Sequence, residues 1–182
     1  YDPNDINVLE GESILVDETD NYLHYVIRFQ NTGTASAINV TVTNTLDDDL
    51  DWDTLQIDGI SHNNYISIRN GNQMSFVFKN IYLPHNLANE AGSQGFICYK
   101  IKPKNNAVVG DLFNNNAQIY FDYNSAIHTN TVVTEVVDLL SNQDLEDNKV
   151  GLYPNPTNGK VYISANFDIK SLTIYNMYGQ KI

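Results

Sequence analysis

Two oxygen-rich clusters are the residues of this sequence that come nearest to a chemical site. One opens the chain and the other lies in a later acidic run; the members that could act as ligands are Asp2, Asn4 and Asp5, and Asp47, Asp49 and Asp51. Calcium takes roughly six to eight oxygen ligands, which closely spaced carboxylates can supply. Neither cluster has the Asp-x-Asp-x-Asp-Gly order of an established calcium loop. Two interpretations stay open: a calcium site, or solvated acidic loops that deter edge-to-edge strand pairing.

No other group of residues has the spacing of a catalytic or metal site. The histidines are His24, His62, His85 and His128, and no two of them stand four residues apart or in a His-x-His pair, as a zinc site would favour. The Gly-x-Ser-x-Gly turn of serine hydrolases is absent. Cys98 lies in an apolar strand pattern, so we expect a buried, inert thiol. The sequence therefore predicts a protein that is not an enzyme and has no cofactor, calcium being the alternative.

Charge and hydropathy narrow the range of partners. The 182 residues include 10 Lys and Arg against 22 Asp and Glu, which gives a net charge of −12. This field repels nucleic acid and anionic membranes, so we expect neither as a partner. No run of about 18 apolar residues is present, and membrane insertion is not expected. Because the single cysteine cannot form an internal disulfide, the fold must rest on its hydrophobic core.

Apolar residues recur with a period of two, which is typical of strands with one buried face. The first two predicted strands bury Leu23, Tyr25, Ile27 and Phe29, and Ile38, Val40 and Val42. The Asn70-Gly71 pair separates two more alternating runs, Ile66 and Ile68 before it and Met74, Phe76 and Phe78 after it. Such a pair between alternating runs predicts a β-hairpin. Further strands are expected at 96–101, 117–121 and 131–137.

Regularly spaced short strands without an amphipathic helix predict an all-β fold: an immunoglobulin-like antiparallel β-sandwich over residues 1–137. Residues 138–149 are mostly polar and acidic and form the predicted linker. Residues 150–182 contain strand-like runs at 160–164 and 171–176, and they are too few to bury a full core. We therefore expect a short, incomplete second β-unit at the C-terminus. Since the chain begins at Tyr1, we also expect a fragment or a processed form.

The C-terminal segment resembles a known family. Its two matching stretches run from Val150 to Lys160 and from Leu172 to Gln180, and the residues that carry the motif are Tyr153, Pro154, Asn155, Pro156, Gly159, Tyr175 and Gly179. They resemble the type A C-terminal sorting domain of type IX secretion substrates in Bacteroidetes. The resemblance implies recognition of residues 150–182 by the outer-membrane translocon and its shuttle protein. It also implies export across the outer membrane, to the cell surface or the medium.

The first domain resembles the immunoglobulin-like conserved-repeat domain that often precedes such a sorting domain. The matching stretches are residues 1–5, 29–33, 81–84 and 119–124. The resemblance implies no catalytic activity, and it favours a structural spacer in a larger surface protein whose activity lies elsewhere. The alternative is an adhesion module for a glycan or a surface protein, with Tyr120 and Tyr123, or Tyr22, as stacking residues. Around Thr54, the sequence Asp-Thr-Leu resembles the short O-glycosylation motif of Bacteroidetes exported proteins.

Overall fold

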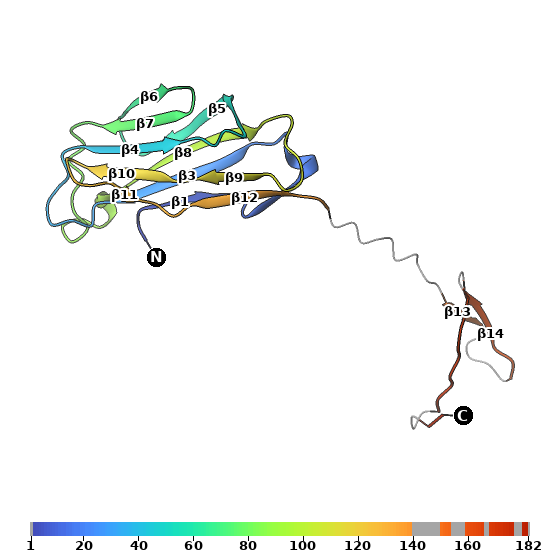
Figure 1. The fold of residues 1–182 in the computed structure, drawn as a ribbon. Helices are drawn as coiled ribbons and strands as arrows, with labels where there is room; N and C mark the ends of the chain where they lie inside the picture. The colour runs from blue at the N-terminus through green and yellow to red at the C-terminus, as the bar shows by residue number, and fades with distance from the viewer. Residues whose placement is uncertain (1, 140–149, 154–158, 166–167, 177–179, 182) are drawn as a thin grey trace. The chain divides into compact units, whose positions relative to one another are not determined.

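The computed structural model describes residues 2–139, 150–153, 159–165, 168–176 and 180–181. The chain forms two compact units, Tyr1–Leu139 and Leu140–Ile182. The predicted linker lies almost wholly outside the described residues. Three sheets build the first unit, and a two-stranded hairpin is the regular structure of the second (Figure 1).

The sheets of the first unit pack as a β-sandwich, which confirms the predicted all-β class. One sheet has the order β1-β3-β8-β5, with bounds Asp5–Val8, Leu23–Gln30, Gln94–Pro103 and Leu50–Ile60. The second has the order β11-β10-β4-β7-β6, with bounds Ile127–His128, Ala117–Phe121, Val40–Thr45, Gln73–Phe78 and Tyr65–Arg69. The third has the order β2-β12-β9, with bounds Ser13–Leu15, Val132–Val137 and Leu112–Asn115. Two short 3-10 helices, Val16–Glu18 and Ala91–Ser93, complete the unit.

Side-chain alternation explains the core. Leu23, Tyr25, Ile27 and Phe29 of β3 are all at most 1% exposed, as their period of two predicts. They face Val40 and Val42 of β4 and the aromatic residues of β7 across the sandwich, and these are buried as well. The Asn70-Gly71 hairpin is also confirmed. It joins β6 to β7, and both residues adopt the positive φ that this turn requires.

Two expectations from the alternation, burial of Ile38 and of Cys98, are wrong, and the two isoleucines of β6 are more exposed than the core positions of the other strands. Ile38 is 47% exposed because β4 begins only at Val40 and leaves it in the preceding loop. Ile66 and Ile68 are 44% and 48% exposed because β6 is an edge strand that extends beyond the opposite sheet's cover. Cys98 is half-buried rather than buried, since Ile97 and Tyr99 take the inward positions of β8. Burial and the nearby Asp58 raise the pKa of its thiol.

A polar network interrupts the core between the sheets. The Tyr99 hydroxyl donates to Asn44 Oδ1 at 2.8 Å and accepts from Asn115 Nδ2 at 2.6 Å. Asn44 in turn donates to Asn115 Oδ1 at 2.6 Å. All three side chains are at most 2% exposed. The Tyr25 ring stacks on Tyr99 with 5.3 Å between centroids, but its buried hydroxyl has no hydrogen-bond partner among the described residues.

The second unit is described only in part. Its hairpin pairs β13, Val150–Tyr153, with β14, Tyr162–Ala165. The expected strand at 171–176 is wrong: among the described residues of this stretch, Tyr175 forms a single bridge to Lys181 and the others belong to no strand. None of the described residues of this unit is buried.

Candidate functional site: the loop end of the sandwich

The N-terminal acidic cluster is engaged in structural contacts. Asp2 Oδ1 accepts a hydrogen bond from the Asn4 backbone N–H at 2.9 Å. Asn4 is 4% exposed, and its Oδ1 accepts from the backbone of Gln30 at 3.1 Å. Asp5 forms an ion pair with Arg28, whose Nε donates at 2.8 Å. The Asn4 and Asp5 oxygens tie the start of the chain to β3, while Asp2 bonds locally to Asn4.

The second acidic cluster organises a turn and a sheet edge. Asp47 accepts from the backbone N–H of Asp49 at 3.0 Å and of Asn114 at 2.8 Å. Asp51 accepts from the backbone of Asp53 at 3.2 Å. Within the described residues, no three His, Cys, Asp or Glu side chains converge as metal ligands would. The calcium site therefore stays a prediction, and the structure shows a structural use for several of its proposed ligands.

The hydroxyl of Thr54, the predicted glycosylation site, makes two hydrogen bonds to the backbone. It donates to the Asp51 carbonyl at 2.6 Å and accepts from the Lys102 backbone N–H at 2.9 Å. A sugar on this oxygen would break the first of these bonds. Glycosylation of Thr54 also stays a prediction.

Asn31 holds several loops together at one end of the sandwich. Its Nδ2 donates to the carbonyls of Ala35 at 2.9 Å and Leu83 at 3.0 Å, and its Oδ1 accepts from the Gly33 backbone at 3.0 Å. Its backbone N–H donates to the Ser93 carbonyl at 3.0 Å. The side chain is 5% exposed, so these bonds are shielded from water. This explains why the Phe-Gln-Asn-Thr-Gly motif needs an amide at this position.

Asp122 performs the same task for a second pair of loops. Its carboxylate accepts from the backbone N–H groups of Ile38 at 3.1 Å and Asn39 at 2.7 Å. Asn80, Tyr82 and Asp122 all adopt positive φ, at 52°, 47° and 54°. A bulky side chain such as Tyr82 rarely adopts this backbone, so surrounding contacts must hold it there. The loops 31–39, 79–86 and 121–127 form what we call the loop end.

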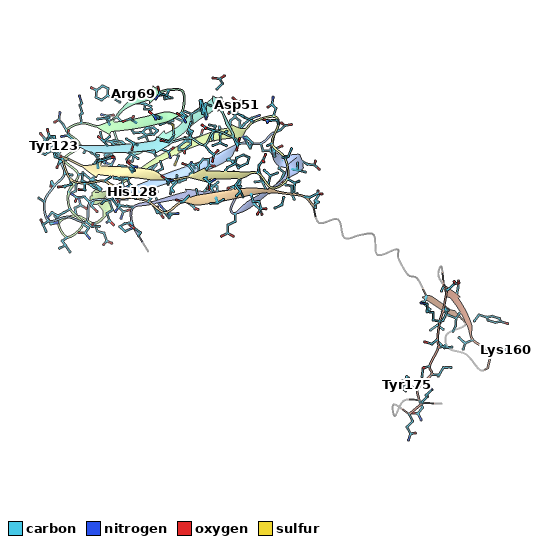
Figure 2. All side chains as sticks on the ribbon, viewed as in Figure 1. Asp51, Arg69, Tyr123, His128, Lys160 and Tyr175 are labelled. Carbon is cyan, nitrogen blue, oxygen red and sulfur yellow. The ribbon has the colours of Figure 1, made fainter. Side chains whose placement is uncertain are left out.

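The loop end exposes apolar and aromatic side chains. Ile38 is 47% exposed, Tyr82 is 63% exposed, and Tyr123 is fully exposed at the tip of its turn (Figure 2). A cavity of about 330 Å³ lies in the same region, lined by residues 31–33, Phe121, Asn124, Ser125 and Ile127. Amide, hydroxyl and aromatic groups of this kind can stack on and hydrogen-bond a sugar or a peptide.

The other tyrosines predicted to stack are less available. The Tyr120 hydroxyl donates to Gln118 Oε1 at 2.7 Å, and its ring is half-buried. The Lys100 and Lys102 ammonium groups lie 5.3 and 4.9 Å from the ring centroid of Tyr22. Sequence patterns missed Ile38 and Tyr82, because the loop position of Ile38 and the positive φ of Tyr82 bring them to the surface.

The sorting motif is described in part. Tyr153 pairs with Tyr162 in the hairpin, Gly159 is exposed, and Tyr175 bridges to Lys181. Pro154, Asn155, Pro156 and Gly179 lie outside the described residues. Among the described residues, no helix is long and apolar enough to cross a membrane.

Comparisons with solved structures support the fold. The C-terminal domain of the Streptococcus agalactiae antigen I/II polypeptide BspA is 16% identical, with a TM-score of 0.54 over 75% of this chain and 50% of that one. The C-terminal domain of the Streptococcus pyogenes antigen I/II-family protein AspA is 14% identical, with a TM-score of 0.51 over 76% and 54%. The chain thus spans about half the length of these proteins. The similarity shows a shared immunoglobulin-like fold.

Family comparison gives the identity of both parts. Residues 2–135 match the family described as "Domain of unknown function (DUF7619)", and residues 151–182 match the "Secretion system C-terminal sorting domain". The comparison with curated proteins gave no match. The predicted resemblance is confirmed, and the sorting domain indicates export across the outer membrane, to the surface or the medium. The chain belongs to the DUF7619 family and ends in a type IX secretion sorting domain.

Proposed function

We propose that the first unit is a non-catalytic spacer in an exported surface protein. We also propose that residues 150–182 are the address that the type IX translocon and its shuttle protein recognise. Support for the second part comes from the family match of residues 151–182. Support for the first part comes from where the chain enters and leaves the sandwich.

The chain enters and leaves the first unit at opposite ends. Asp5 pairs with Arg28 near the end of β3, next to the loop end, whereas Val137 pairs with Leu15 at the far end (Figure 1). Strand β8, with 10 residues, runs along this direction and spans about 34 Å at 3.4 Å per residue. A domain of this geometry adds its length to whatever precedes and follows it. This placement is the observation that carries the spacer proposal.

A replacement experiment tests the spacer. Residues 2–139 are replaced, in the natural protein, by an unrelated sandwich of similar length whose ends are also opposite. An epitope tag ahead of Tyr1 reports antibody access on whole cells. A spacer predicts that access falls when the unit is deleted and returns with the replacement. Access that the unrelated sandwich fails to restore contradicts the spacer, because residues specific to this unit would then be required.

A binding module is the second candidate, and the loop end favours it. Exposed Tyr82 and Tyr123 lie on loops that also line or adjoin a cavity. The test is binding of the purified chain to a glycan array and to extracellular-matrix proteins, with Tyr123→Ala as the variant. Tyr175→Ala is the control, because Tyr175 is an exposed ring, at 62%, that lies outside the first unit. Binding lost only in Tyr123→Ala would favour the module over the spacer.

A further inference from the structure

Most open sheet edges of the first unit carry a feature that blocks further strand pairing. Along β1, the Asn130 side chain donates to the Ile6 carbonyl and accepts from the Ile6 N–H, at 2.9 and 3.0 Å. Strand β5 presents Asp51 and Asp58 and has two register shifts along β8. Strands β11 and β2 have only two and three residues. Charges, bulges, short lengths and capping side chains are the usual protections of an edge.

Strand β6 has one of these protections only, the charge of Arg69 at its last position. It pairs with β7 on one side only, and all five residues, Tyr65–Arg69, are exposed. Its pairing with β7 runs without a register shift, and it contains neither proline nor lysine. No Asp or Glu occurs anywhere between residues 59 and 89, although the chain as a whole has a net charge of −12. An open, regular edge without carboxylates can accept another strand.

The apolar side chains of β6 lie on the side of the sheet that faces the core. Ile66 pairs with Phe76 and Ile68 pairs with Met74, and both partners on β7 are at most 1% exposed. Paired residues of neighbouring strands share a face, so the isoleucines continue the core beyond the last covered strand. Both remain about half exposed there. A further strand beside β6 would cover them.

We propose that the occupant of this edge is β6 of a second copy of the chain, paired antiparallel about a two-fold axis at Ser67. The strand reads Tyr-Ile-Ser-Ile-Arg, which is nearly symmetric about its centre. In this register Ile66 lies opposite the partner's Ile68, and Tyr65 lies opposite the partner's Arg69. The surface that forms a two-fold interface must be complementary to itself, and the sequence of β6 meets this requirement in the antiparallel register. The two five-stranded sheets would become one continuous sheet.

Charge gives the dimer a characteristic salt dependence. Two copies with a charge of −12 each repel at long range, and salt screens this repulsion. At the edge itself, Arg69 lies where it can stack on the partner's Tyr65, while Lys79 already lies 5.8 Å from the Tyr65 ring within one copy. We therefore expect dimerisation to strengthen as the salt concentration rises.

Sedimentation velocity of the full chain over a range of concentrations measures the dimer. Ile66→Lys and Ile68→Lys each place a charge on the edge, and we expect either to weaken dimerisation by about tenfold or more. Ile57→Lys is the control, because Ile57 is a comparably exposed isoleucine, at 38%, on the edge strand β5. A chain that stays monomeric overturns the proposal. So does association that persists in both variants, as it would if the exposed C-terminal unit drove it.

Cross-linking tests the register without disturbing the isoleucines. Cys98 is first replaced by serine, and Ser67→Cys is then introduced. The two-fold axis places the two new thiols side by side, so mild oxidation is expected to give a covalent dimer. Ser125→Cys, an equally exposed serine at the loop end, is the control and should remain monomeric. Equal cross-linking at both positions, or none at residue 67, overturns the proposed pairing.

Discussion

The buried tyrosine pair gives the sharpest prediction about stability. Tyr99 donates and accepts one hydrogen bond each within the core, to Asn44 and from Asn115. In Tyr99→Phe, Asn44 Oδ1 loses its donor and Asn115 Nδ2 loses its acceptor, while both groups remain buried. Leaving buried polar groups unpaired costs about 1–3 kcal/mol of unfolding free energy. For a unit of this size, that corresponds to a fall in Tm of about 3–15 °C.

Tyr25→Phe is the matched variant. It removes the same hydroxyl from the neighbouring stacked ring, where that group is buried without a partner among the described residues. Removing an unpaired buried hydroxyl relieves its desolvation cost, so the unfolding free energy should stay level or rise by about 1 kcal/mol. Urea unfolding followed by circular dichroism measures both variants. Equal destabilisation by the two substitutions would refute the assignment of the hydrogen bonds to Tyr99 alone.

The same pair predicts how stability responds to alkali. Burial raises the pKa of both Tyr25 and Tyr99 above the ordinary value of about 10. Below pH 10 both are protonated whether the chain is folded or unfolded, so their contribution is constant. Above it the unfolded chain releases these protons and the folded chain keeps them, so stability falls by about 1.4 kcal/mol per pH unit for each tyrosine. Tyr25→Phe should reduce this slope in urea unfolding measured at several pH values above 10.

Three further experiments test the packing, the loop end and the thiol. A Cβ on Gly95 would lie 2.2 Å from the Phe29 ring, so Gly95→Ala should lower the free energy of unfolding in urea by about 1–3 kcal/mol. The control is Gly59→Ala, whose Cβ would make an ordinary contact at 3.8 Å and should lower it far less. Asp122→Ala removes the acceptor for two backbone N–H groups and should increase amide hydrogen exchange at the loop end while the core strands stay protected. Unchanged exchange would contradict the role of Asp122 in holding these loops together. Since the thiol pKa of Cys98 is raised, its alkylation at pH 8 should be slower than that of a free cysteine peptide, and an equal or faster rate would contradict the assigned environment.

Period-two patterns predicted the core strands because a single rule, burial of one face, decides them. Strand β3 follows the pattern at every position. The same rule does not decide the exposure of Ile66 and Ile68, since it indicates which face a residue takes but not whether another strand covers that face. Whether an inward-facing side chain is buried depends on the position of its strand in the sheet. That position is decided by pairing between strands that are far apart in the sequence.

The loop end was harder to predict, for a related reason. Motif resemblance pointed to Asn31 and Asp122, but their roles depend on backbone groups in several loops, and Asn31 reaches Leu83, 52 residues away. Positive φ at Tyr82 has no sequence signal comparable to Asn-Gly. In the acidic clusters, by contrast, the sequence carried a clear signal that the structure explains in another way. Their composition suggested calcium, while local backbone N–H groups account for several of the carboxylates.

Export of the natural protein tests the central claim most directly. The protein, tagged ahead of Tyr1, is expressed in a type IX-competent bacterium in two deleted forms, one lacking residues 150–182 and the other lacking residues 2–135. The measurement is the fraction of tag at the cell surface or in the medium. The account predicts that the first deletion retains the protein in the periplasm and that the second is still exported. Export that survives the loss of residues 150–182 would contradict it.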